Sequence, residues 1–136
     1  MTYLLDTNVC IDLLRGQSTQ IRMRFKEISL GNYLIAISIV VLFELWYGVA
    51  KSTRQQENTQ RLGILLAGPI EILSLTPEDV QMAGQIRAEL EAKGNSIGAY
   101  DVLIAGQALQ QQAILVTANT SEFTRVQGLK LEDWTN

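Results

Sequence analysis

The N-terminal stretch at residues 3–8 constrains the fold of this chain more than any other segment. A short apolar run ends there on a carboxylate, Asp6, and a helix-like pattern follows directly. An apolar run of this length predicts a buried strand that leads into a turn. Because ligands bind at the carboxyl ends of strands in open α/β sheets, Asp6 is predicted to lie at a functional edge of a sheet.

The rest of the chain alternates between strand-like and helix-like segments. Buried strands are predicted at residues 3–5, 33–37, 70–75 and 113–116, with an edge strand at 130–131. Helices are predicted at 9–14, 18–28, 39–51, 61–67, 77–93 and 97–111, with a turn or short helix at 119–123, whereas residues 52–58 fit a loop or a helix start. This alternation indicates right-handed βαβ units. We therefore expect an α/β fold with a central, mainly parallel twisted sheet of four or five strands flanked by helices, forming one domain over residues 1–136.

The predicted helix at 39–51 is apolar almost all round, and Glu44 is the only acid in it. Such a helix is mostly buried, in a core or against a partner. We expect Trp46 and Tyr47 to pack in the core; a face for a partner protein or for a second copy of the chain is the alternative. In the helix at 9–14, Thr7 or Asn8 is expected to be the cap.

The composition excludes several kinds of site. The chain has no histidine and one cysteine, which rules out Ser-His-Asp and Cys-His catalysis and zinc sites built from imidazole or thiolates. A metal must therefore be held by oxygen atoms, which points to Mg²⁺ or Mn²⁺. The net charge of −3 does not fit a basic nucleic-acid coat. With no membrane-spanning run, no signal-peptide pattern and no internal disulfide, we expect a cytoplasmic protein that does not enter a membrane.

Three carboxylates, Asp6, Glu44 and Asp101, stand in apolar segments without a neighbouring lysine or arginine. A buried carboxylate without a partner either stays protonated or binds a cation. Asp6 follows a strand and Asp101 begins a helix, so both are predicted to lie at the same edge of a parallel sheet. Glu44 lies about 9 Å along its helix, at 1.5 Å per residue, and reaches that edge only if the helix leans over it.

Each of these carboxylates also has a structural explanation. Asp6 could cap the next helix, Asp101 could interact with its helix dipole, and Glu44 could pair with a distant arginine or lie at a subunit interface. One shared Mg²⁺ explains all three, because this ion is usually held by one or two carboxylates, water and substrate phosphate. Such an ion activates water and stabilises charge on a phosphoryl group, so the predicted reaction is phosphodiester hydrolysis.

Several sequence blocks resemble those of one known family. They read LLDTN at 4–8, LFELWYG at 42–48, QIRAEL at 85–90, IGAYDVLIA at 97–105, LVTANTSEF at 115–123 and EDW at 132–134. In this order they resemble the PIN-domain ribonucleases, and more narrowly the VapC toxins of bacterial toxin–antitoxin pairs. The resemblance implies a compact three-layer fold and a Mg²⁺- or Mn²⁺-dependent endonuclease that cuts RNA, which in some similar toxins is initiator tRNA. It also implies inhibition by a VapB-type antitoxin, a homodimer, and operator DNA bound only through the antitoxin.

The resemblance assigns roles to four of these residues by position. Asp6 and Asp101 match the principal metal ligands of the family, and Glu44 matches its second acid, which binds the ion directly or through water. Thr117 matches a threonine of the family at the end of a strand. The three acids Asp6, Glu44 and Asp101 are expected to be catalytic.

The chain departs from the family pattern at Asn119, where many members have aspartate. An amide is a poorer metal ligand than a carboxylate, so the fourth acid position is filled either by Asn119 or by Glu122, one helical turn later, which is expected to be catalytic. Thr7, Asn8, Thr117 and Asn119 are expected to support the acids or to contact substrate.

Three other functions remain open from the sequence. An aspartyl-phosphate phosphatase also begins with a strand that ends in Asp, but it usually carries a second Asp where this chain has Asn8. A receiver-like signalling domain needs an acidic pair after its first strand, which is missing. A PIN-like interaction module that binds an antitoxin or regulator without cutting RNA is favoured by Asn119, and an RNase assay with and without EDTA would distinguish it from an enzyme.

Overall fold

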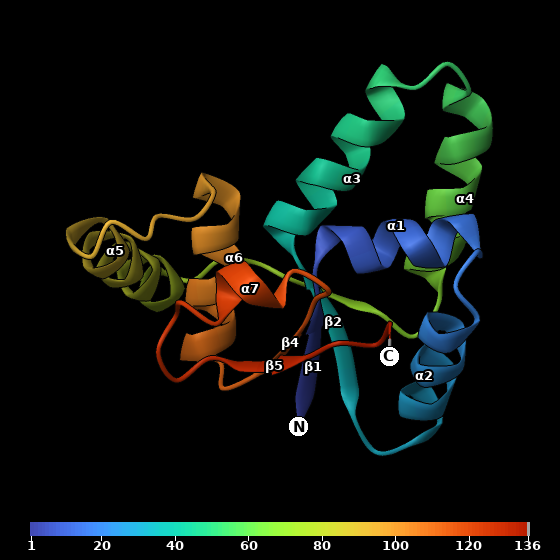
Figure 1. Ribbon diagram of the computed structural model, residues 1–136. Helices are drawn as coiled ribbons and strands as arrows, with labels where there is room; N and C mark the ends of the chain where they lie inside the picture. The colour runs from blue at the N-terminus through green and yellow to red at the C-terminus, as the bar shows by residue number, and fades with distance from the viewer. Residues whose placement is uncertain (136) are drawn as a thin grey trace.

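A five-stranded parallel sheet forms the centre of the computed structural model, which describes residues 1–135 (Figure 1). The strand order is β3-β2-β1-β4-β5, and every neighbouring pair is parallel. The strands are β1 (Thr2–Leu5), β2 (Leu34–Ser38), β3 (Glu71–Leu73), β4 (Ile114–Val116) and β5 (Lys130–Glu132). The five predicted strands and the parallel sheet are thus confirmed, although β3 is shorter than the predicted 70–75.

Seven helices connect or follow the strands within residues 1–135. They are α1 (Thr7–Arg15), α2 (Thr19–Leu30), α3 (Ile39–Lys51), α4 (Gln55–Ala67), α5 (Pro77–Ala92), α6 (Ala99–Gln110) and α7 (Thr120–Phe123). Side-chain caps from Ser18, Ser38 and Thr76 begin α2, α3 and α5. The helix α4 starts six residues before the predicted 61, so residues 52–58 contain a helix start. An ion pair between Glu57 and Arg61, one turn apart at 2.8 Å, favours this longer helix.

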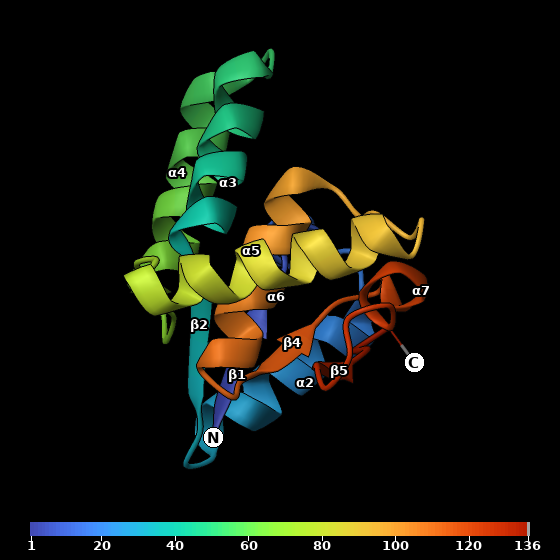
Figure 2. The same ribbon diagram turned by 90° about the vertical axis from the view of Figure 1, so that its left-hand side faces the viewer.

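The helices lie on both faces of the sheet and make a three-layer structure. Helices α5 and α6 cover one face and α2 lies on the other, as both views of the ribbon show (Figures 1 and 2). Helices α3 and α4 run side by side and extend beyond the carboxyl end of the sheet (Figure 2). This arrangement confirms the expected α/β fold. Among residues 1–135, no helix is long and apolar enough to cross a membrane.

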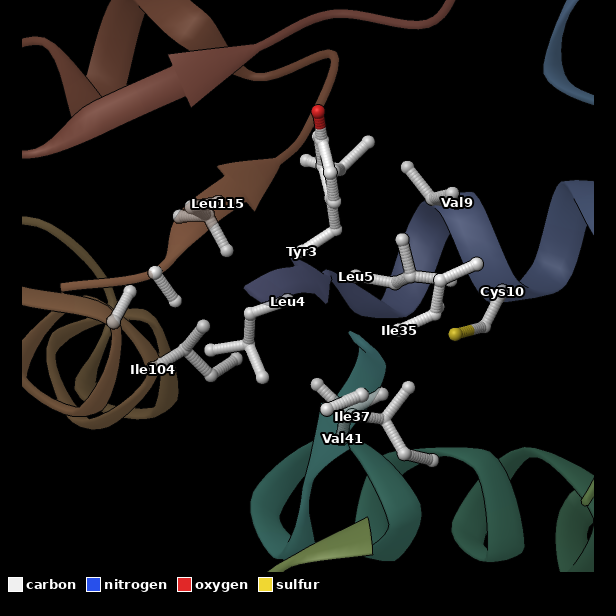
Figure 3. Packing of buried hydrophobic residues seen from close by; sticks show 14 of the residues in the cluster. Tyr3, Leu4, Leu5, Val9, Cys10, Ile35, Ile37, Val41, Ile104 and Leu115 are labelled. Atoms are coloured by element: carbon white, nitrogen blue, oxygen red, sulfur yellow. The ribbon is translucent and has the colours of Figure 1, made fainter. Parts of the chain in front are cut away.

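The central strand β1 is buried on both faces, which explains its continuous apolar run. Leu4 points towards Ile104 of α6, and Leu5 points towards Val9 of α1 (Figure 3). Both leucines are at most 1% exposed. A strand covered on both sides has to be apolar at every position rather than at alternate ones.

Helix α6 is held tightly against α5. A Cβ atom added at Gly106 would lie 2.6 Å from the Cβ of Ala83, so only glycine fits at this crossing. The buried Asp79 accepts a hydrogen bond from Gln111 at 3.0 Å, and Gln107 donates to the carbonyl oxygens of Leu73 and Ser74. These contacts fix α6, the helix that carries Asp101.

The prediction that Trp46 and Tyr47 pack in the core is wrong. Phe43, Trp46 and Tyr47 are 54%, 42% and 58% exposed on the outer side of α3. The reason is that most of α3 extends past the sheet, so the sheet does not cover its outer side. The apolar outer face of α3 is therefore available to a partner.

Candidate active site

Asp6 follows directly on β1, at the point where the order of the strands reverses. Strand β1 lies between β2, which follows it in the chain, and β4, which comes much later. Ligands bind beside such a switch point in open α/β sheets. The backbone N–H of Asp6 donates to the Val116 carbonyl oxygen at 3.0 Å, which ties the end of β1 to the end of β4.

The carboxylate of Asp6 is buried and also caps α1. Its Oδ1 accepts a hydrogen bond from the backbone N–H of Val9 at 2.9 Å. The cap is therefore Asp6, and the prediction of Thr7 or Asn8 as the cap is wrong, because the strand ends immediately before Asp6 and places its side chain over the first turn. Burial raises the pKa of Asp6, against the lowering effect of hydrogen bonds from the Thr117 side chain and the Val9 N–H.

Asp101 is the third residue of α6, and its carboxylate lies across the start of that helix. A Cβ atom added at Gly98 would come within 3.2 Å of Oδ2 of Asp101, so the glycine leaves room for the carboxylate. Partial burial, followed in decreasing order by the charges of Glu122, Glu44 and Asp6, raises the pKa of Asp101 to about 6. All four predicted acids are thus close enough to affect one another.

Glu44 joins the site from α3, which rises from the carboxyl end of β2 and contacts α1 and α6 (Figure 1). The hydroxyl of Thr7 donates to Oε1 of Glu44 at 2.7 Å. The helix therefore leans over the sheet edge, as the metal-site interpretation requires. No arginine or lysine among residues 1–135 forms an ion pair with Glu44.

Thr117, Asn119 and Glu122 enter from the segment after β4. Thr117 is fully buried; its hydroxyl donates to Asp6 and accepts from the backbone N–H of Asn119 at 2.9 Å. The side-chain amide of Asn119 donates to Oε2 of Glu122. This segment therefore links the first acid of the site to the last through hydrogen bonds.

Two further residues near the site are Asn8, which was predicted to support the acids or to contact substrate, and Asp12, which was not predicted. Asn8 is exposed, and its side chain forms no hydrogen bond within the part of the chain that the structure describes. Asp12, on α1, was not predicted, yet its charge raises the pKa of Asp6 more than that of Glu44 does. Asp12 lies among the apolar residues of 9–14, just as Glu44 and Asp101 lie in apolar segments of their own. This shared pattern could have identified Asp12 from the sequence.

The chemistry of the site fits a hard divalent cation. All available donors are carboxylate, hydroxyl or amide oxygen atoms, as Mg²⁺ prefers. Two of the acids, Asp6 and Asp101, have raised pKa values, and within residues 1–135 none of the four acids has a basic partner. The described residues hold no ready-made cage of three or more acidic or cysteine ligands. A site of this kind suits an ion that keeps water and substrate oxygens in its coordination shell.

A groove of about 340 Å³ begins beside Glu44 and runs between α1, α3 and α4. Its floor is apolar and includes Leu45 and Val49. Three basic side chains line the groove: Arg15 of α1, Lys51 of α3 and Arg61 of α4. The acidic site thus adjoins a groove lined by basic side chains, of which Arg61 is paired with Glu57.

Comparison with known proteins identifies the family. The PIN domain family model matches residues 3–129. Ribonuclease VapC2 of Rickettsia felis is 40% identical over 134 residues, and the tRNA(fMet)-specific endonuclease VapC of Shigella flexneri is 38% identical over 136; each match covers 98% of both chains. The crystal structure of Rickettsia felis VapBC2 bound to a promoter DNA fragment contains a chain that superposes with a TM-score of 0.93, at 39% identity, over 98% of this chain and 99% of that one. The chain therefore belongs to the PIN-domain family and, within it, to the VapC ribonucleases.

Proposed function

We propose that this VapC ribonuclease, the toxin of a VapBC-type pair, hydrolyses RNA phosphodiester bonds with Mg²⁺ or Mn²⁺ held by Asp6 and Asp101. The observation that carries the proposal is the convergence of four acids at the carboxyl ends of β1 and β4, none of which has a basic partner within residues 1–135. When bound, the ion would activate a water molecule and neutralise charge on the phosphate.

The side chains around the ion have separate tasks in this proposal. Asp6 and Asp101 supply ligand oxygens, and capping of α1 by Oδ1 of Asp6 leaves Oδ2 for the ion. Thr7 engages Oε1 of Glu44, so Oε2 is free to orient the attacking water and accept its proton. Glu122 adds negative charge beside Asp101 and holds the ion or its water ligands.

A VapB-type antitoxin is the expected protein partner. Structural neighbours with TM-scores of 0.90 and above are chains of VapBC complexes from Rickettsia felis, Salmonella typhimurium and Haemophilus influenzae, two of them bound to DNA. The groove beside Glu44 suits a segment with apolar side chains for its floor and acidic side chains for its cations. Binding there would cover the active site.

We also propose that residues 1–136 form one domain and that the protein is cytoplasmic. Residue 136 lies outside the described part. The proposal includes a homodimer as well, since Phe43 and Tyr100 form an exposed edge-to-face pair, with ring centroids 5.6 Å apart, that offers an apolar face. Operator DNA is expected to bind only through the antitoxin. Light scattering of the purified chain would check the oligomeric state.

An RNase assay tests the enzymatic proposal. The purified chain should cleave initiator tRNA or total bacterial RNA in Mg²⁺ or Mn²⁺ and should lose this activity in EDTA. Asp6→Asn and Asp101→Asn should be inactive, whereas Glu78→Gln, which changes an exposed acid at the start of α5, should keep full activity. Cleavage in EDTA, or by both site variants, would contradict the proposal. Antitoxin binding without RNA cleavage in any metal would favour the interaction module instead.

A further inference from the structure

Neutral hydrogen-bond donors hold three acids of the site. Thr117 donates to Asp6, and Thr7 donates to Glu44. The third is Glu122, whose Oε2 accepts from the side-chain amide of Asn119. A neutral donor fixes the direction of a carboxylate without cancelling the charge that a metal ion needs.

The amide of Asn119 faces Glu122 with its nitrogen. A carboxylate accepts hydrogen bonds and cannot donate them when ionised, so Nδ2 of Asn119 is the atom that faces it. The backbone N–H of Asn119 meanwhile donates to Thr117 at 2.9 Å. Asn119 precedes α7 as its cap residue, yet its side chain makes no capping hydrogen bond. Its amide is therefore committed to Glu122 and not to the helix end.

An aspartate at this position could not play the same part. It would lack the N–H donor, and its charge would repel Glu122 at hydrogen-bonding distance. Asn119 and Glu122 thus form a hydrogen-bonded pair. Position 119 needs an amide donor because the carboxylate lies one helical turn later, at Glu122.

We propose that Asn119 is a positioning residue for Glu122, and that it holds this carboxylate next to Asp101 as the fourth acid of the site. The inference rests on the proposed function, because it assumes that the acids bind a cation. It differs from a role for Asn119 as a weak metal ligand, since a ligand would act whether or not Glu122 is charged, whereas a positioning residue acts only through it.

A double-mutant cycle on Mn²⁺ affinity separates the two roles. Mn²⁺ is titrated by calorimetry into the full chain and into Asn119→Ala, Glu122→Gln and the double variant. We expect Asn119→Ala to weaken Mn²⁺ binding about tenfold, and to weaken it less than about twofold once Glu122 is Gln. Ser121→Ala, which changes an exposed neighbour on α7, should bind Mn²⁺ like the unmutated chain.

Kinetics provide a second readout on the same variants. Asn119→Ala should lower kcat for initiator tRNA and leave KM within about twofold, because the hydrogen bond orients an acid of the chemical step and not a substrate contact. An unchanged Mn²⁺ affinity in Asn119→Ala, or the same loss in both backgrounds, would overturn the positioning role alone. Failure of the unmutated chain to bind Mn²⁺ would overturn the proposed function together with this inference.

Discussion

Replacing Asp101 with asparagine is predicted to stabilise the metal-free protein while it abolishes RNA cleavage. Burial and the charges of Glu122, Glu44 and Asp6 raise the pKa of Asp101 from 3.8 to about 6. At pH values between 3.8 and about 6, the folded protein binds more protons at Asp101 than the unfolded chain does. Stability from this group is therefore greatest below pH 4 and falls as the pH rises to about 6.

The size of this effect follows from the pKa difference. A shift of about two pKa units corresponds to about 3 kcal/mol. Asp101 keeps part of its surface in water, so solvent screening reduces the expected penalty to about 1–2 kcal/mol at pH 7.5. Asparagine has nearly the same shape and no charge, so it removes the repulsion and leaves the packing in place.

Urea denaturation in EDTA measures the prediction. At pH 7.5, Asp101→Asn should be more stable than the unmutated chain by about 1–2 kcal/mol, and the difference should shrink towards pH 4. Added Mg²⁺ should stabilise the unmutated chain and leave the variant almost unchanged. The exposed Glu78→Gln serves as the control and should follow the unmutated chain throughout. An Asp101→Asn variant that is less stable than the unmutated chain at pH 7.5, or that gains equally from Mg²⁺, would refute the reasoning.

Two further predictions concern packing and hydrogen bonding. Gly106→Ala should destabilise the protein by about 1–3 kcal/mol, because the added methyl group would collide with Ala83. The control Gly84→Ala on α5, where the space is open, should be neutral or stabilising. Equal urea midpoints for the two variants would contradict the close helix crossing. Thr7→Val should lower kcat about tenfold, because it removes the hydrogen bond that holds Glu44. Thr7→Ser keeps the hydroxyl and should retain most of the activity. A fully active Thr7→Val would rule out this role for the hydroxyl.

Local sequence patterns predict much of this fold. The short apolar runs became strands, and the capping signals at Ser38 and Thr76 mark the starts of α3 and α5. The exposure of the outer side of α3 could not be predicted from the sequence, because it depends on how far the helix extends beyond the sheet. An apolar helix has the same sequence pattern whether a core or a partner protein covers it.

The convergence of the predicted acids follows in part from the sequence, but the contacts among them do not. Asp6 and Asp101 follow from strand and helix starts, which a parallel sheet brings to one edge. The approach of Glu44 depends on the tilt of α3, and a tilt is set by packing against helices distant in sequence. The hydrogen bond between Asn119 and Glu122 depends on side-chain directions in a four-residue helix, on which sequence spacing gives no information.

Crystals of the full chain grown with Mn²⁺ offer the most direct test of the metal site. Anomalous scattering locates the ion independently of any activity. We predict a peak at about 2.1 Å from carboxylate oxygens of both Asp6 and Asp101. A Mn²⁺-saturated crystal with no peak between these two residues would contradict a shared cation as the reason that the acids converge.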